Sequence, residues 1–553
     1  MRVRGRAPHA WPWHGLLLLV LAAGTFFRLA QLDAQMLIDD EWHAVRMLLG
    51  ADYATIATHF GLADHSIPLT LAYRWLYLRD ALDEWSMHLP LLACGLALLV
   101  AAPRLMRELP LPTQAIWCGL LAVSPTLVYF SRTARPYAFL ALAGVLAFVA
   151  FRRWQAGGRH RGSWALLYAA ATVLAGWAHV LALPFLLWPF VHHGVGALLA
   201  TRDPVRRGPA LRQLLALAVL AFAVLGTLAA LLLPPLLADW GAMSAKAAVG
   251  TPDIGSLYRT LLMQFGLAQA WPAAPLLVLS AWGAWRLWRR DRELVALILG
   301  AALAGALLIL LLRPAWIQHA PVLVRYAAPM LPWLLLFPAE GLSALVALVS
   351  RRAALAAPLA AAALAGLVLA GPLPEWYRVP NQFMEHAAFQ FDYDHATNPY
   401  WTQLELGPVS PFYRELATRP PASVTLVETP ARAVSNYMPD PWLQAIHRQN
   451  VKFALASPVC GMGDWDEYRP GPHGPHFRRV LPLGDILSGR ERGGDYLVLR
   501  RHPWTLPREN FPWPTPWPDI EACARTIEES LGAPVWRDAE ILVFRIPPWP
   551  PAR

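Results

Sequence analysis

The stretch LIDDEWHAVRMLL (37–49) closely follows the long apolar run WHGLLLLVLAAGTFFRLA (13–30), and this pair decides how the chain is read. A run of about 20 apolar residues is long enough to cross a bilayer as a helix. Asp39, Asp40 and Glu41 therefore lie where such a span leaves the membrane. Carboxylates near lipid are costly and usually functional. The stretch predicts a catalytic or ion-handling site.

Acidic residues are scarce in the apolar part of the chain. Residues 1–372 contain sixteen Asp and Glu, and nine of them lie between Asp33 and Glu84. The carboxylates are thus concentrated in the first long loop, at 33–85, on one side of a membrane.

The composition predicts a polytopic α-helical membrane protein. Hydrophobic residues make up 56% of the 553 residues and charged residues only 15%, whereas a soluble domain is nearer a quarter charged. About eleven spans are expected, near 14–32, 86–103, 113–130, 136–151, 164–179, 180–199, 214–236, 272–288, 294–312, 326–349 and 354–372. The first is expected to stay uncleaved, because the apolar region continues through Phe26 and Phe27 without a small-residue cleavage site.

The arginines of the short loops predict the orientation. With eleven spans, six arginine groups fall on one side, which the positive-inside rule makes the cytoplasm. They are Arg2/Arg4/Arg6, Arg104/Arg107, Arg152/Arg153/Arg159/Arg161, Arg202/Arg206/Arg207/Arg212, Arg286/Arg289/Arg290/Arg292 and Arg351/Arg352. The N-terminus is then cytoplasmic, and the 33–85 loop and the C-terminal segment lie outside.

Residues 373–553 change in composition and predict a separate α/β or α+β domain outside the membrane. The short stretches SVTLVE, KFALAS, DYLVLRR and EILVFRI read as strands, and RELATRP and IEACARTIEESLG as helices. About 180 residues can bury a core of their own. Cys460 and Cys523 both fall here, where a disulfide could persist; the sequence leaves open whether they pair.

Several basic side chains fall on the outer side, where the positive-inside rule does not require them. These are Arg132, Arg135, Lys246, Arg313, His319 and Arg325. Any one of them could be a basic side chain at a helix end that extends to the membrane surface. Together, opposite an acidic loop, they suggest a site for a phosphate or pyrophosphate.

No CxxC, HExxH, P-loop or GxGxxG motif occurs in the sequence. Motif support for a soluble metalloprotease, an NTPase or a Rossmann dinucleotide site is therefore lacking. The expected partners include the lipid bilayer but no nucleic acid.

Four segments resemble the GT-C superfamily of integral-membrane glycosyltransferases, in particular bacterial dolichyl-phosphate-mannose-protein mannosyltransferase-like and aminoarabinose-transferase-like enzymes. They are IDDEWHAVRMLL (38–49), ADHSIPLTLAYRW (63–75), SPTLVYFSRTARPYAFLAL (124–142) and VRYAAPMLPWLLLF (324–337). The resemblance implies transfer of a sugar from a polyprenyl-phosphate-linked donor at the outer membrane face. One departure is His65-Ser66-Ile67-Pro68, where relatives commonly have His-Pro-Pro.

The resemblance also implies roles for the acidic residues. Asp40 aligns with the essential aspartate of the family and is the expected general base. Glu41 and Asp39 would orient it or bind the acceptor, and Asp64 would be the second acid of the pocket. For Asp39, helix capping is an equally good interpretation.

Basic and aromatic residues complete the predicted site. Arg132, Arg135 and Arg325 are candidates for the donor phosphate, although Arg135 could instead form a structural ion pair. The remaining predicted substrate contacts are His65, Tyr137, Lys246 and His319. For Tyr137, as for Trp42, anchoring at the membrane interface is the favoured alternative.

The overall prediction is a glycosyltransferase of the bacterial inner membrane. Residues 1–372 would form the transmembrane domain and residues 373–553 the periplasmic one. The acceptor would be a glycan, a lipid or a protein. A divalent metal is possible, because acids with His43 or His65 could bind one. The rivals are a transporter or flippase for a lipid-linked sugar, and a non-catalytic scaffold.

Overall fold

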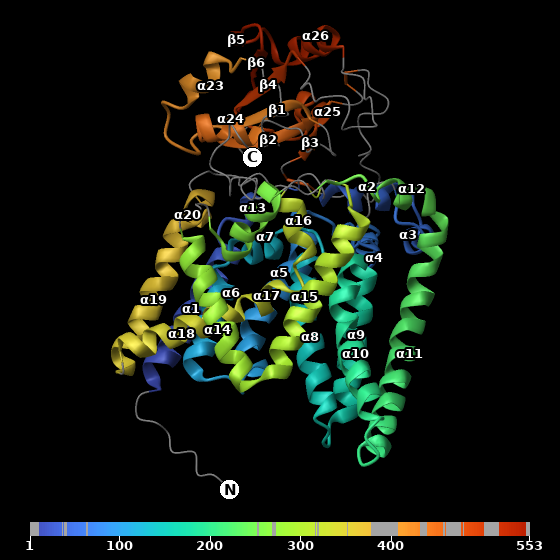
Figure 1. Ribbon diagram of the computed structural model, residues 1–553. Coiled ribbons are helices and arrows are strands. Elements are labelled where there is room, and N and C mark those ends of the chain that lie inside the picture. The colour runs from blue at the N-terminus through green and yellow to red at the C-terminus, as the bar shows by residue number, and fades with distance from the viewer. Residues whose placement is uncertain are drawn as a thin grey trace.

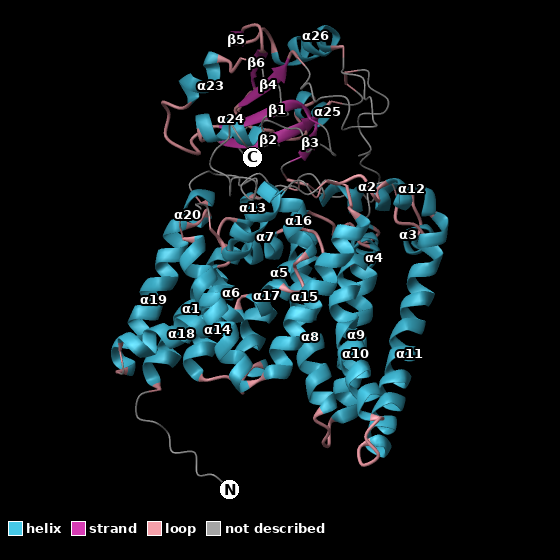
Figure 2. Ribbon diagram, viewed as in Figure 1, coloured by secondary structure: helices cyan, strands magenta, loops and turns pink. Residues whose placement is uncertain are grey.

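The computed structural model describes residues 10–35, 37, 41–61, 65–251, 254–267, 272–315, 317, 320–350, 352–377, 408–431, 440–456, 459–460, 477–478, 480–502 and 519–548. Four predicted site residues, Asp39, Asp40, Asp64 and His319, lie outside this part of the chain. The described part forms a bundle of helices with a small sheet-containing unit at one end (Figures 1 and 2).

Helices dominate residues 10–377. The bundle contains α1 (Trp11–Leu29), η1 (Leu32–Ala34), α2 (Trp42–Gly50), α3 (Tyr53–Thr58), α4 (Ile67–Tyr77), α5 (Glu84–Leu105), α6 (Leu111–Val123), α7 (Pro125–Arg132), α8 (Tyr137–Gln155), α9 (Arg161–Ala178), η3 (Val180–Ala182), α10 (Leu183–Ala200), α11 (Arg207–Ala238), α12 (Trp240–Ala245), α13 (Ile254–Phe265), α14 (Ala273–Arg290), α15 (Arg292–Leu312), α16 (Ala320–Tyr326), α17 (Leu331–Leu334), α18 (Leu336–Val349), α19 (Ala353–Ala370) and α20 (Leu373–Trp376).

The prediction of a polytopic α-helical membrane protein is confirmed. Seven stretches of described helix are long and apolar enough to cross a membrane: Trp11–Leu29, Glu84–Leu105, Tyr137–Gln155, Val180–Ala200, Arg207–Ala238, Arg292–Leu312 and Leu331–Val349. The pair α6 and α7, bent by 55°, makes an eighth if it counts as one span. Helices α9, α14 and α19 occupy the other three predicted spans but are not among these long apolar helices.

The bend between α6 and α7 is stabilised by an arginine from another helix. Pro125 begins α7 and has no N–H, so it cannot bond to the carbonyl of Leu121 as a continuous helix would. The Arg28 guanidinium of α1 donates to the carbonyls of Leu121 (3.0 Å) and Ala122 (3.1 Å), and its Nε donates to Ser131 Oγ (3.1 Å). Arg28 therefore supplies the donors that the broken helix lacks.

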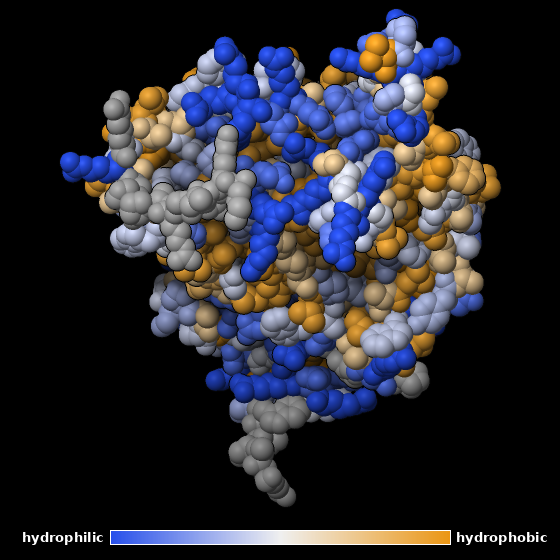
Figure 3. Space-filling view, turned by 90° about the horizontal axis from the view of Figure 1, so that it is seen from below, coloured by the Kyte–Doolittle hydropathy of each residue, from blue (hydrophilic) through white to orange (hydrophobic). Residues whose placement is uncertain are grey.

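The two ends of the bundle differ in their chemistry. Helix α1 begins at the end opposite the sheet, and the α8–α9 and α10–α11 loops turn at that same end (Figure 1). Arginines of these loops, such as Arg159, Arg161, Arg202 and Arg206, are exposed. Seen from that end, the surface carries several hydrophilic patches between apolar ones (Figure 3). The structure thus separates the arginine-rich loops from the sheet, as the predicted orientation requires.

Reporter fusions test this orientation. A reporter that is active only in the periplasm should be on when fused after Arg553 and off when fused after Arg207, because the arginine-rich loops stay in the cytoplasm. Activity of both fusions should be normalised to the amount of membrane-inserted protein. The reverse pattern would place the acidic loop in the cytoplasm and overturn the orientation.

The C-terminal unit is a mixed sheet with helices on both faces. Its strands are β1 (Thr425–Ala431), β2 (Asn450–Leu455), β3 (Val480–Pro482), β4 (Tyr496–Arg500), β5 (Trp536–Arg537) and β6 (Ile541–Arg545). They lie in the order β3-β2-β1-β4-β6-β5, parallel from β3 to β4 and antiparallel from β4 to β5. The helices are α23 (Pro411–Leu416), α24 (Asp440–His447), α25 (Leu483–Leu487) and α26 (Ile520–Leu531).

All four predicted strands and the predicted helix at 520–532 are present, whereas α23 overlaps the predicted helix at 414–420 only over 414–416. Alternate residues of each strand point to opposite faces. Leu497 and Phe544 pack with α26, while Leu426 and Val498 pack with α23. The parallel centre with an antiparallel edge identifies it as the α/β alternative.

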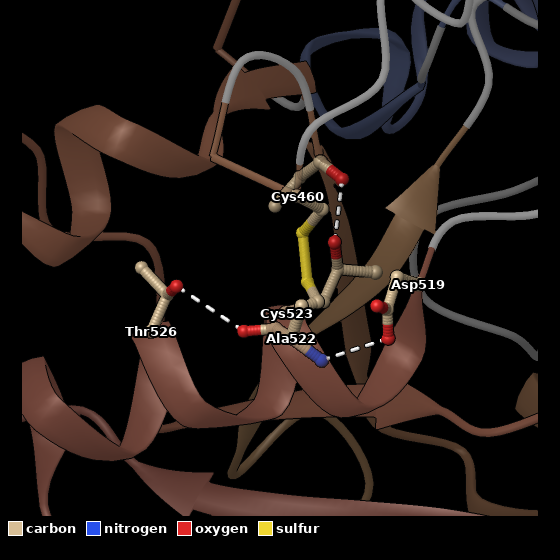
Figure 4. Close-up of a disulfide and its surroundings, with 7 residues drawn as sticks. Cys460, Asp519, Ala522, Cys523 and Thr526 are labelled. Atoms are coloured by element: carbon tan, nitrogen blue, oxygen red, sulfur yellow. Dashed lines mark hydrogen bonds between the residues drawn. A yellow bond between two sulfur atoms is a disulfide. The ribbon is translucent and has the colours of Figure 1, made fainter.

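Cys460 and Cys523 form a disulfide, which settles the pairing that the sequence left open. Their Cα atoms lie 4.5 Å apart. Figure 4 shows the bond joining α26 to the segment after β2, next to the helix cap in which Asp519 accepts from the Ala522 N–H (3.0 Å). The disulfide therefore ties a covering helix to the strand region of the sheet.

The sheet also packs on the 33–85 loop. Val451, Phe453 and Leu455 of β2 share one buried cluster with residues of that loop, including Leu48 and Tyr73. In addition, both carboxylate oxygens of Glu84 accept from the Arg478 N–H, at 2.8 and 3.0 Å. The C-terminal unit thus contacts the loop that carries the acidic segment.

Glu84→Ala should loosen this contact. A hydrogen bond to a charged group contributes about 1.5–3 kcal/mol, so hydrogen exchange should speed up in β3 and α2 while the sheet itself stays folded. Glu108→Ala, at an exposed position, is the matched control. Equal exchange in both variants would show that the Glu84 bond does not hold the two parts together.

Candidate active site

Glu41 joins three segments of the predicted site. Its side chain is almost fully buried, and its Oε1 accepts from the backbone N–H of Ala134 (2.6 Å) and contacts His88 Nε2 (2.8 Å). Ala134 belongs to the turn between α7 and α8, and His88 to the first turns of α5. The acidic segment and the Ser-x-x-Ala-Arg-x-Tyr segment, far apart in sequence, therefore meet at one carboxylate.

Both residues of this contact adjoin predicted site residues in the sequence. Asp40 precedes Glu41 in the chain, and Arg135 follows Ala134. The Glu41 carboxylate therefore contacts the turn that carries Arg135, a candidate phosphate ligand, while Asp40, the expected base, lies outside the described residues. The predicted catalytic role of Glu41 stays a prediction, while its contacts explain how it orients the loop.

Arg135 is buried within the same group of side chains. Its positive charge lowers the pKa of His65 and opposes the rise in the pKa of Tyr73, on which the charge of Glu41 also acts. Burial is the larger cause of both shifts and raises the pKa of Tyr73. Arg135 therefore lies within electrostatic range of the loop between α3 and α5.

His65 holds its own loop together. Its Nδ1 contacts Thr70 Oγ1 (2.9 Å) and its Nε2 contacts the carbonyl oxygen of His59 (3.0 Å). Burial and the charge of Arg135 lower the pKa of His65 to about 4, so the ring is neutral at pH 7. Because both ring nitrogens have protein partners, His65 in this arrangement does not fit a metal ligand.

Arg132, like Arg28, donates hydrogen bonds to backbone carbonyls at the end of another helix. It is fully buried, and its Nη1 donates to the carbonyls of Phe27 (3.1 Å) and Ala30 (2.5 Å), while Nε donates to Gln35 Oε1 (3.1 Å). These bonds satisfy carbonyls at the C-terminal end of α1. They give Arg132 a structural role, and its predicted contact with the donor phosphate stays a prediction.

A second group contains Tyr137 and Arg325. Arg325 Nη1 lies 3.4 Å from the Tyr137 hydroxyl, and the guanidinium carbon lies 6.0 Å from the Tyr137 ring centre. The His179 ring lies between Tyr137 and Tyr326, with centroid distances of 5.8 and 5.7 Å. Tyr137 is buried, so packing in the protein replaces the interfacial anchoring considered for it. The two predicted residues come together, with a histidine that was not predicted.

Lys246 follows α12, in a segment that forms backbone hydrogen bonds with the segment before α16. The Ala315 N–H donates to the Lys246 carbonyl (3.0 Å), and Gly250 N–H donates to the Arg313 carbonyl (3.0 Å). A Cβ on Gly250 would come within 2.0 Å of the Pro314 oxygen, so only glycine allows this approach. Lys246 therefore borders the segment that leads to Arg325.

Two further residues were missed by the sequence reasoning. His88 interrupts the apolar run SMHLPLL, and a titratable side chain inside a span was a signal that could have identified it. Asp239 at the end of α11 accepts from the N–H groups of Phe60 (2.6 Å) and Gly61 (3.1 Å). Nothing in the local sequence links Asp239 to that loop.

The described part of the chain brings together no three His, Cys, Asp or Glu side chains as metal ligands. Asp39, Asp40 and Asp64, the acids most relevant to the predicted metal, lie outside that part.

No protein-family model and no curated protein sequence matches the chain. Its structure is similar to ArnT from Cupriavidus metallidurans in the apo state, with 13% identity and a TM-score of 0.49 over 96% of this chain and 98% of that one. For ArnT from Cupriavidus metallidurans bound to undecaprenyl phosphate, the identity is 14% and the TM-score 0.43, over 97% of this chain and 98% of that one. A third similar structure is archaeal oligosaccharyltransferase AglB from Archaeoglobus fulgidus, in complex with an inhibitory peptide and a dolichol-phosphate. Its identity is 12% and its TM-score 0.43, over 89% of this chain and 69% of that one. At such identities and TM-scores, the function must be inferred from the chain's own residues.

Proposed function

We propose that the protein is a glycosyltransferase that moves a sugar from a polyprenyl-phosphate-linked donor to a glycan, lipid or protein acceptor. It would act at the periplasmic face of the bacterial inner membrane, with residues 1–372 as the transferase domain and 373–553 as a periplasmic domain. The single observation that carries this proposal is the Glu41–Ala134 bond, because it joins the acidic segment to the arginine-containing segment.

Each group would have a distinct task in the reaction. Asp40 would take the proton from the acceptor nucleophile as that atom bonds to the anomeric carbon of the sugar. The bond between this carbon and the phosphate oxygen breaks, and the electron pair leaves with the polyprenyl phosphate. Arg135 and Arg325 would stabilise the negative charge that develops on this phosphate.

Arginine suits this task in a partly dry site. Its guanidinium stays charged and presents a planar fork that matches phosphate oxygens. Arg135 acts electrostatically on His65 and on Tyr73, which the charge of Glu41 also affects. Arg325 contacts Tyr137, whose ring lies next to that of His179. Tyr137 follows Arg135 by two residues. The two groups therefore border a common turn, between α7 and α8, on which a phosphate could bind.

A transporter for a lipid-linked sugar is the main alternative. Transporters commonly use discontinuous helices near the membrane midplane to hold substrate, and the bent pair α6–α7 is discontinuous. However, the carbonyls exposed at this break already accept from Arg28. The break is therefore satisfied by protein groups, which favours the transferase.

The lipid that co-purifies with the protein tests the proposal. The full chain would be purified from bacterial membranes and analysed by native mass spectrometry with stepwise removal of bound lipid. The proposal predicts retention of a polyprenyl phosphate or its sugar-linked form after bulk phospholipids are lost. Retention of bulk phospholipids alone, even after added polyprenyl phosphate, would contradict it.

A further inference from the structure

The pair Glu41 and His88 is a buried polar contact in otherwise apolar surroundings. Both side chains are 1% exposed, and the only histidine of α5 points its Nε2 at Glu41 Oε1 from 2.8 Å. Nearby, Met87 and Leu91 of the same helix are fully buried. A buried polar group needs hydrogen-bond partners, and this oxygen accepts from the Ala134 N–H and contacts His88 Nε2.

The position of His88 allows it to fix the rotamer of Glu41. Glu41 follows Asp39 and Asp40 in the sequence, and α2 begins directly after it. Its carboxylate reaches the Ala134 N–H only in a suitable rotamer, and a side chain that is hydrogen-bonded on a rigid helix can hold such a rotamer. His88 lies on α5, which also packs against α7 and α8. It is therefore anchored to the same helices as Ala134.

We infer that His88 is a positioning residue: it orients the Glu41 carboxylate toward the Ala134 N–H and thereby fixes Glu41 relative to the turn that carries Arg135. This inference rests on the proposed function for its catalytic consequence. The structural part, the dependence of the Glu41–Ala134 bond on His88, stands without it. A displacement of about 1 Å between reacting groups can cost about a hundredfold in rate.

Two amide substitutions test the geometry. The Gln amide nitrogen can reach about the position of histidine Nε2, whereas the shorter Asn amide cannot. Both residues are polar and of moderate size, so His88→Gln and His88→Asn should fold alike. His160→Ala, at an exposed position in the α8–α9 loop, is the control for substitution of a histidine elsewhere.

The first readout is hydrogen exchange of the peptide that contains the Ala134 amide, which needs no enzymatic activity. Exchange should rise about tenfold or more in His88→Asn, because a hydrogen bond to a charged group is lost. It should stay near the wild-type rate in His88→Gln and His160→Ala. Equal exchange in the Gln and Asn variants, whether slow or fast, would overturn the inference.

The second readout separates positioning from binding. With a polyprenyl-phosphate sugar as donor, His88→Asn should lower kcat about tenfold or more and change the KM for donor little, while His88→Gln should keep most of kcat. A change in KM alone would overturn the positioning role. If exchange responds as expected but the wild-type protein transfers no sugar, the structural inference stands and the proposed function fails.

Discussion

Asp40→Asn is expected to lower turnover by about a hundredfold or more while the protein stays folded and inserted. Asn keeps the size of the side chain but cannot accept the acceptor's proton, and general-base catalysis typically contributes about 10²–10⁴-fold. The measurement is the rate of sugar transfer at saturating donor and acceptor, normalised to inserted protein.

Asp52→Asn is the matched control for this substitution. Asp52 lies in the same 33–85 loop, is exposed, and caps α3 by accepting from the Thr55 N–H (2.8 Å). Asn caps helices about as well as Asp, so this variant should keep near wild-type turnover. Near wild-type turnover of Asp40→Asn as well would remove Asp40 from the mechanism.

Arg135→Ala should lower turnover by on the order of a hundredfold, even at saturating donor. The negative charge on the leaving phosphate grows toward the transition state, so the loss affects kcat as well as donor affinity. Arg135→Lys keeps the charge but loses the planar fork and should fall between Ala and wild type. Steady-state kinetics with the donor varied measures both parameters.

Arg79→Ala controls for the loss of a positive charge elsewhere, because Arg79 lies in the 33–85 loop, is exposed and lies over the Trp75 ring. It should leave kcat unchanged. If Arg135→Ala altered only the apparent affinity for the acceptor, the phosphate-binding role would be wrong, and a structural role would explain its burial.

Much of the fold could be predicted, because the length of apolar runs and the spacing of apolar residues reflect which parts of the chain avoid water. The apolar runs predict helices wherever the structure has long ones, and the alternating stretches SVTLVE and EILVFRI predict β1 and β6. The bend at Pro125 was not predicted as a break. Its position depends on Arg28, which lies almost 100 residues earlier and supplies the missing donors.

The candidate site was only partly predictable for a related reason. Resemblance identified Glu41, but its partner is a backbone N–H, and every residue except proline has one. Arg132 and Arg135 looked alike in sequence, whereas the structure commits Arg132 to the carbonyls of α1. Which basic residue serves the fold is decided by the tertiary position of helix ends, and sequence spacing does not contain that information.

The most direct test of the central claim is a transfer assay on the purified full chain in nanodiscs. A radiolabelled polyprenyl-phosphate sugar would be incubated with bacterial envelope lipids and glycans as acceptors, with Asp40→Asn as the inactive control. The account predicts that label appears on an acceptor as polyprenyl phosphate is released in equal amount, and that both signals fall about a hundredfold in the control. Movement of intact labelled lipid across a bilayer without release of polyprenyl phosphate, equal in wild type and control, would contradict it.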